Sequence, residues 1–189
     1  TFLTLLLFFT FGAIFGQGVY QFPNSDFESW DGDGLPTSWY SFSDIKCDLS
    51  GLAALGCSSA KENHHNKLSG SDAQSGYSID IYVKSVIGVK ANGAISTGRT
   101  RVASTNATEG VNYNYDPSDY RWTFKGRPDS ISFYAKKISG YSHGGNAYFK
   151  VFIHDDNTFK DKADGTLEGT SYGSMLYPFY PTPDWNRFV

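Results

Sequence analysis

The sequence is poor in cysteine, methionine and surplus positive charge. Of its 189 residues, 2 are cysteine and 1 is methionine, and 16 Lys and Arg stand against 19 Asp and Glu, a formal net charge of −3. A protein that binds a phosphate backbone needs a basic surface, and no basic block interleaved with aromatic residues is found. Nucleic acid is therefore excluded as the expected partner.

Long apolar runs are also absent, apart from one at the N-terminus. Residues 2–15 are nearly all apolar, and the run ends just before Gln17. A membrane-spanning helix needs about 20 apolar residues, so this run is too short, and no stop-transfer pattern follows it. We interpret residues 1–17 as a secretory signal peptide, clipped at its start, and residues 18–189 as one domain. Because no cysteine follows the run as a lipid attachment point, we expect a secreted or cell-surface protein without a membrane span.

Cys47 and Cys57 are the two cysteines of the chain. Exported proteins meet an oxidising environment, in which a pair of cysteines usually forms a disulfide. The alternative is a zinc site, for which two cysteines without correctly spaced partners supply half of a ligand set. We predict the disulfide.

Helical periodicity is missing from the remainder, where apolar residues recur at every second position. The alternation is clearest in three segments, 76–83 (GYSIDIYV), 130–138 (SISFYAKKI) and 146–155 (NAYFKVFIHD). The side chains expected to be buried are Tyr77, Ile79, Ile81 and Val83 in the first, Ile131, Phe133 and Ala135 in the second, and Ala147, Phe149, Val151 and Ile153 in the third. Turn-rich stretches lie between such segments, at 31–36, 69–76, 106–120, 138–146 and 155–173. This pattern predicts an all-β protein of antiparallel strands that each bury one face.

Three further segments, in this order, resemble a known family. They are 24–41 (NSDFESWDGDGLPTSWYS), 91–99 (ANGAISTGR) and 127–138 (RPDSISFYAKKI). Together they resemble the PCMD carbohydrate-metabolism domain of exported Bacteroidetes proteins. The resemblance implies a jelly-roll β-sandwich similar to galactose-binding-like domains, with a role in carbohydrate handling. The chain stops where an apolar and aromatic alternation begins, so we expect a further C-terminal strand that is absent here, and the resemblance implies the same strand.

Asn24, Asp26 and Glu28 alternate with other residues, so on a strand their side chains would share one side. Ca²⁺ takes six to eight oxygen ligands, and sandwiches of the kind that the sequence resembles often hold a structural calcium beside the first strand. We therefore predict a calcium site at these three residues. The alternative is an exposed edge strand whose charges discourage association with other strands.

Large aromatic residues occupy the other phase of the alternating segments. They are Tyr82, Tyr134, Tyr148 and Phe152. Aromatic rings on a sheet face can stack on the C–H surfaces of sugar rings while nearby polar groups bind the hydroxyls. We predict that these four form a glycan-binding surface. The alternative is that loops cover them or that they pair across strands.

Catalytic signatures are few. Asp155 and Asp156, with His143 nearby, are the residues that could serve as acid and base. A glycosidase needs two carboxyl groups fixed about 5–10 Å apart, and the sequence gives no sign of that arrangement. We expect a non-catalytic carbohydrate-binding module. The alternatives are a glycoside hydrolase of the same architecture and a purely structural adhesion or spacer domain.

Overall fold

The computed structural model describes most of the chain after the predicted signal peptide. The described residues are 21–51, 54–55, 57, 61, 64–86, 89–102, 111–113, 122–123, 129–138, 147–162 and 164–189. The signal peptide and His143 lie outside these ranges. Within them, no helix is long and apolar enough to cross a membrane.

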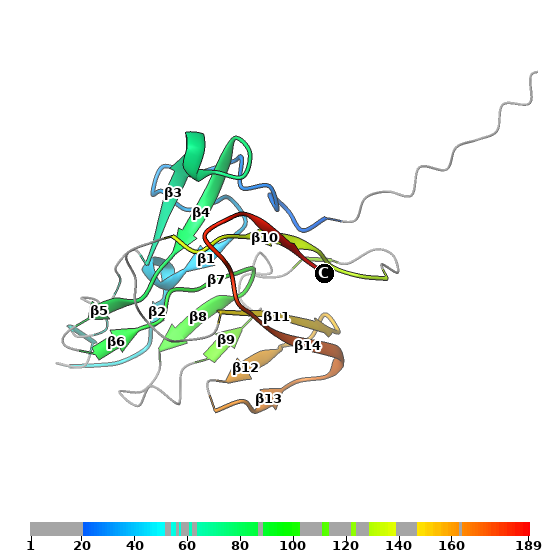
Figure 1. Cartoon of the computed structure of the whole chain (residues 1–189). Helices are drawn as coiled ribbons and strands as arrows, with labels where there is room; N and C mark the ends of the chain where they lie inside the picture. The colour runs from blue at the N-terminus through cyan, green and yellow to red at the C-terminus, as the bar shows by residue number, and fades with distance from the viewer. Residues whose placement is uncertain are drawn as a thin grey trace, which may run out of the picture.

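Short strands make up nearly all of the regular structure (Figure 1). They are β1 (Tyr40–Ser41), β2 (Lys46–Cys47), β3 (His65–Ser69), β4 (Tyr77–Ile81), β5 (Lys84–Val86), β6 (Val89–Ala91), β7 (Ile95–Ser96), β8 (Arg99–Val102), β9 (Val111–Tyr113), β10 (Phe133–Ala135), β11 (Ala147–His154), β12 (Lys160–Lys162), β13 (Leu167–Glu168), β14 (Ser171–Phe179) and β15 (Asn186–Phe188). Two 3₁₀ turns accompany them, η1 (Phe42–Asp44) and η2 (Gly70–Asp72). The predicted all-β class is confirmed.

The described strands form one larger sheet and several two-stranded ribbons. The sheet has the order β13-β12-β9-β8-β2, and the ribbons are β1–β7, β3–β4, β5–β6, β10–β15 and β11–β14. All pairings are antiparallel except β2 with β8, which is parallel. Three antiparallel pairs near the C-terminus are nested in the sequence. β12 and β13 lie between β11 and β14 along the chain, and all four lie between β10 and β15.

Four phenylalanines join the ribbon β10–β15 to the ribbon β11–β14. The ring centroid of Phe133 lies 4.7 Å from that of Phe149, 4.9 Å from that of Phe179 and 5.4 Å from that of Phe188. These spacings are those of favourable stacked and edge-to-face ring pairs. We call Phe133, Phe149, Phe179 and Phe188 the phenylalanine cluster. It holds one face of each ribbon against the other, and in Figure 1 β10 lies above β11 and β14.

The ribbon β3–β4 buries a different face from the one that its sequence predicts. Tyr77 and Ile81 are 37% and 42% exposed, while Ser78 between them is buried. The Ser78 hydroxyl accepts a hydrogen bond from the backbone N–H of Gln74, which closes the bend before β4. On the other face, the ammonium of Lys67 lies 3.5 Å from the centroid of the Tyr77 ring. A hydroxyl that satisfies a turn donor is therefore buried where an apolar residue was expected.

The predicted disulfide between Cys47 and Cys57 is confirmed, with an S–S distance of 2.07 Å and a Cα–Cα distance of 6.0 Å. Cys47 ends β2, which pairs with β8 from a distant part of the chain. Cys57 is buried. The bridge therefore anchors the loop after β2 to the edge of the larger sheet.

Candidate functional site

One face of the ribbon β11–β14 displays large apolar side chains to solvent. Tyr148 lies directly opposite Pro178, and Lys150 opposite Leu176, so these four side chains share a face. Tyr148 and Leu176 are each 59% exposed, and Tyr180, which follows β14 directly, is 68% exposed. We call Tyr148, Leu176, Pro178 and Tyr180 the tyrosine platform. Contiguous apolar side chains left in water mark a binding surface more often than isolated ones do.

The other face of the ribbon is buried where it meets the phenylalanine cluster, whereas Ile153, expected to be buried, and Met175 on that same face are 47% and 40% exposed. Phe149 and Phe179 point away from Tyr148 and Pro178, since neighbouring residues of a strand face opposite sides, and both belong to the phenylalanine cluster. Tyr177 also contacts Phe133, with ring centroids 6.4 Å apart. Aromatic packing thus fixes the ribbon on the face opposite Tyr148. This leaves its Tyr148 side free to meet a ligand without a change of fold.

Tyr134 is exposed, as predicted, but it does not join the platform. It precedes Ala135 in β10 and is 52% exposed. Its neighbour Phe133 points into the phenylalanine cluster, so Tyr134 points to the outer side of the other ribbon. Tyr134 and Tyr148 therefore lie on opposite faces of the stacked ribbons.

Phe152 shares a face with Tyr148, but another part of the chain covers it. The ring of Phe159, which is itself buried, lies 5.2 Å from that of Phe152 and 4.7 Å from that of His154. The next residues form β12, where the carboxylate of Asp161 accepts a hydrogen bond of 2.6 Å from the ammonium of Lys150. Phe152 thus packs against the protein itself, and the segment from Phe159 to Asp161 marks one boundary of the platform.

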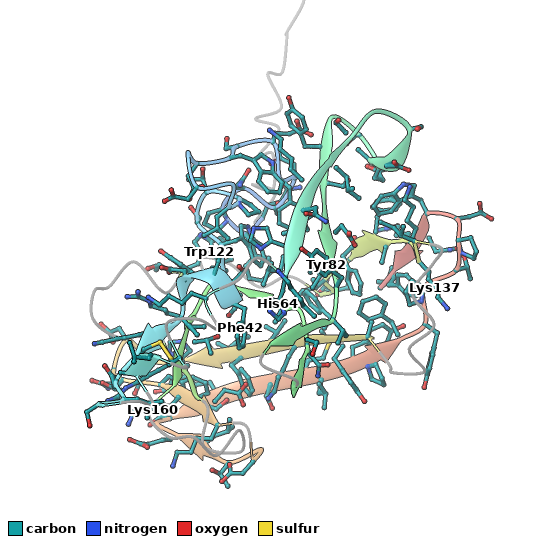
Figure 2. All side chains as sticks on the ribbon, turned by 90° about the vertical axis from the view of Figure 1, so that its left-hand side faces the viewer. Phe42, His64, Tyr82, Trp122, Lys137 and Lys160 are labelled. Carbon is teal, nitrogen blue, oxygen red and sulfur yellow. A yellow bond between two sulfur atoms is a disulfide. The ribbon has the colours of Figure 1, made fainter. Side chains whose placement is uncertain are left out.

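Tyr82 lies toward the inside of the molecule, close to His64 and Phe42 (Figure 2). Its ring is nearly parallel to the imidazole of His64, with centroids 6.5 Å apart. His64 is fully buried, and its ring centroid lies 4.7 Å from that of Phe42. The structure therefore places the four predicted aromatic residues in four different surroundings, and it brings only Tyr148 into the platform.

None of the three residues of the predicted calcium site lies on a strand, since Asn24 and Asp26 are in a turn and Glu28 is in the irregular segment that follows it. Asn24 and Phe27 both have positive φ angles, of 48° and 57°, which an extended strand does not allow. The amide of Asn24 donates to the carbonyl oxygens of Ser29 and Thr37 and accepts from the N–H of Ser29. This side chain therefore serves to hold the turn together.

The two carboxylates of the predicted calcium site have separate partners. Asp26 accepts a hydrogen bond from the backbone N–H of Glu28, and Glu28 accepts one of 2.9 Å from the backbone N–H of Tyr77. Among the residues that the structure describes, no group of three or more His, Cys, Asp and Glu side chains is placed to hold a metal ion. The calcium site stays a prediction.

Asp80 is the half-buried carboxylate of the β3–β4 ribbon, and it faces Asn66 across the two strands. Burial raises the pKa of Asp80 above its ordinary value of 3.8, and a hydrogen bond from Asn66 opposes part of that rise. The folded protein therefore holds this proton more tightly than the unfolded chain does. As pH rises through the range above 3.8, ionisation of Asp80 removes stability from the folded state.

We expect Asp80→Asn to be more stable than the parent protein at neutral pH, because the variant has no carboxylate to ionise and keeps an amide that can pair with Asn66. The advantage should shrink on acidification and vanish near pH 3.8 and below, where Asp80 is protonated. Urea unfolding at a series of pH values measures it. Asp184→Asn, at an exposed aspartate, is the matched control. Equal pH profiles for the parent and Asp80→Asn would contradict the assignment.

Of the carboxylates considered for catalysis, Asp155 has a structural role in the turn after β11. Both oxygens of Asp155 accept hydrogen bonds from Asn157, one from its backbone N–H and one from its side-chain amide. Asp156 is exposed. The turn after β11 thus accounts for the Asp155 side chain.

Leu176, Pro178 and Tyr180 belong to the platform but are not predicted by the alternation of the three segments considered. A signal for them does exist in residues 173–180, where Ser174, Leu176, Pro178 and Tyr180 alternate with Gly173, Met175, Tyr177 and Phe179. Both phases contain large apolar residues, so the pattern does not tell which one faces the core.

No family model, no curated protein and no solved structure matches the chain.

Proposed function

We propose that the chain is a secreted or surface-associated carbohydrate-binding module that has no catalytic activity of its own. The observation that carries this proposal is the tyrosine platform, in which Tyr148 lies opposite Pro178, with Leu176 and Tyr180 on either side of Pro178 along the same exposed ribbon face. Tyrosine combines an apolar ring with a hydroxyl that can form hydrogen bonds. Such rings suit sugars, whose rings offer C–H surfaces on one side and hydroxyls at the edge.

The remaining parts of the proposal rest on the sequence and on the disulfide. The apolar leader, residues 1–17, and the Cys47–Cys57 bridge support an exported protein. The family resemblance and the many short antiparallel strands support a jelly-roll sandwich of the galactose-binding-like type. A structural calcium near Asp26 and Glu28 remains part of this proposal.

The test is glycan binding by the double variant Tyr148→Ala, Tyr180→Ala. Loss of both rings should weaken binding by about 1–3 kcal/mol in total, judged from the value of aromatic contacts. The fold should survive, because both side chains are more than half exposed. Glycan arrays identify the ligand, and calorimetry then measures the affinity of each variant.

Tyr134→Ala is the matched control, since Tyr134 is similarly exposed but lies on the opposite side of the stacked ribbons. It should bind glycans as the parent does. If Tyr134→Ala weakens binding and the double variant does not, the ligand surface lies on β10. Release of reducing ends by the parent would favour the hydrolase, and absence of all glycan binding would favour the spacer domain.

A further inference from the structure

The tyrosine platform is electrically neutral over its centre. On the stretch of this face from Tyr148 to Phe152, with Ser174 to Pro178 opposite, Lys150 is the one charged side chain. Its ammonium lies 2.6 Å from an oxygen of Asp161, whose side chain is 12% exposed. Because this pairing offsets the charge, Lys150 attracts an approaching anion much less than a free ammonium does. The surface therefore favours an uncharged ligand.

The platform is also longer than it is wide. From Leu176 to Tyr180 the chain advances four residues, which is about 13 Å at the rise of an extended strand. Across the ribbon, Tyr148 and Pro178 are directly paired, so their Cβ atoms lie about 5 Å apart. The long direction exceeds a single pyranose ring and matches a run of two or three. The segment from Phe159 to Asp161 limits the platform at its far end.

The platform is an open face and not an enclosed pocket, since its tyrosines and Leu176 are each more than half exposed. A cavity of about 320 Å³ does occur in the described residues, but it lies in another region, where residues from the stretch Asp31 to Asp44 line it. Among the described residues, the segment from Phe159 to Asp161 borders the platform at one end, and the exposed tyrosines at the other end form no pocket that would require the terminus of a chain.

We propose that the tyrosine platform binds an internal stretch of an uncharged polysaccharide, two or three pyranose rings at a time. This inference rests on the proposed carbohydrate-binding function and adds the charge of the ligand, its length and its mode of binding. The Lys150–Asp161 ion pair then acts as a specificity device, because it keeps a cation at the edge of the platform from recruiting acidic polysaccharides.

The first experiment is calorimetric titration of the parent protein with linear neutral oligosaccharides, from monosaccharide to hexasaccharide, in gluco, xylo and manno series. Affinity should rise by about two- to tenfold with each ring added up to the trisaccharide and then level off, since each further stacked ring adds one aromatic contact. Reduction of the terminal sugar to its alditol should leave the affinity of the hexasaccharide unchanged.

The second experiment uses Asp161→Asn, which keeps the shape of the side chain and releases the charge of Lys150. The parent should not bind polygalacturonate, whereas the variant should bind it in a manner that weakens as salt is added. The double variant Lys150→Gln, Asp161→Asn should lose this binding again. Retained affinity of Asp161→Asn for the neutral trisaccharide shows that the platform is intact.

The outcomes separate the inference from the function on which it rests. A monosaccharide that binds as tightly as the trisaccharide, loss of binding after alditol formation, or tight binding of polygalacturonate by the parent would each overturn the inference and leave carbohydrate binding standing. Failure of the parent to bind any glycan on an array would overturn both.

Discussion

Phe133→Ala should lower the free energy of unfolding by about 3 kcal/mol, the low end of the range for truncation of a packed phenylalanine. The low end applies because Phe133 is half-buried. Its ring touches Phe149 and Phe179 from one ribbon and Phe188 from its own. The variant leaves a cavity between the two ribbons. The contacts of Phe133 with Phe149 and Phe179 are the closest of the described ring pairs that join these ribbons. Urea unfolding monitored by circular dichroism measures the loss.

Tyr134→Ala is the control within the same strand. Its side chain is 52% exposed, so its removal should change stability by less than about 1 kcal/mol. Similar losses for Phe133→Ala and Tyr134→Ala would mean that the phenylalanine cluster does not hold the ribbons together.

Replacement of both cysteines, Cys47→Ser with Cys57→Ser, should cost about 2–3 kcal/mol. The bridge spans a sequence separation of 10 residues, and the loop-entropy model assigns this loss to the greater freedom of the unfolded chain. Thermal unfolding of the parent and the variant measures it. Reductant should lower the melting temperature of the parent toward that of the variant and leave the variant unaffected. A parent protein that is insensitive to reductant under conditions that open the bridge would contradict the prediction.

The alternation of residues predicts strands well where it is regular. The segments 130–138 and 146–155 contain β10 and β11, and the exposure of Tyr134 and Tyr148 follows from their phase. Alternation is a local property of the chain, because successive side chains of a strand point to opposite sides whatever surrounds them. It can therefore assign a side, but it cannot tell which of several surfaces that side joins.

Contacts from distant segments account for the parts that local patterns miss. Phe152 is covered because the chain turns after β11 and brings Phe159 back over it. The stretch 155–173 has the composition of a long turn, yet it contains β12 and β13. Lys160 and Lys162 of β12 both form ion pairs with Glu168 of β13. In such short polar strands the pairing comes from ion pairs and backbone hydrogen bonds, which leave no apolar period in the sequence.

The turn at Asn24 shows a different limit. Polar residues at every second position, as at Asn24, Asp26 and Glu28, are typical of one face of a strand. Asparagine is also among the residues that tolerate positive φ and satisfy nearby backbone groups through the side chain. Here the second property prevails, since the Asn24 amide bonds to the backbone of Ser29 and Thr37. Distinguishing the two from sequence requires knowing which backbone groups lack partners.

The nested order of the last antiparallel pairs has a consequence for how the chain acquires its structure. Pairing of β12 with β13 joins residues close in sequence, whereas β10 and β15 are separated by about fifty residues. Closing a long loop costs less entropy when part of it is already ordered. Assembly is therefore expected to proceed outward, from the inner hairpin to β11–β14 and then to β10–β15. Phe133 and Phe188 would be added together in the final step. The phenylalanine cluster between the two ribbons is therefore completed only after the ribbon that carries the platform has formed.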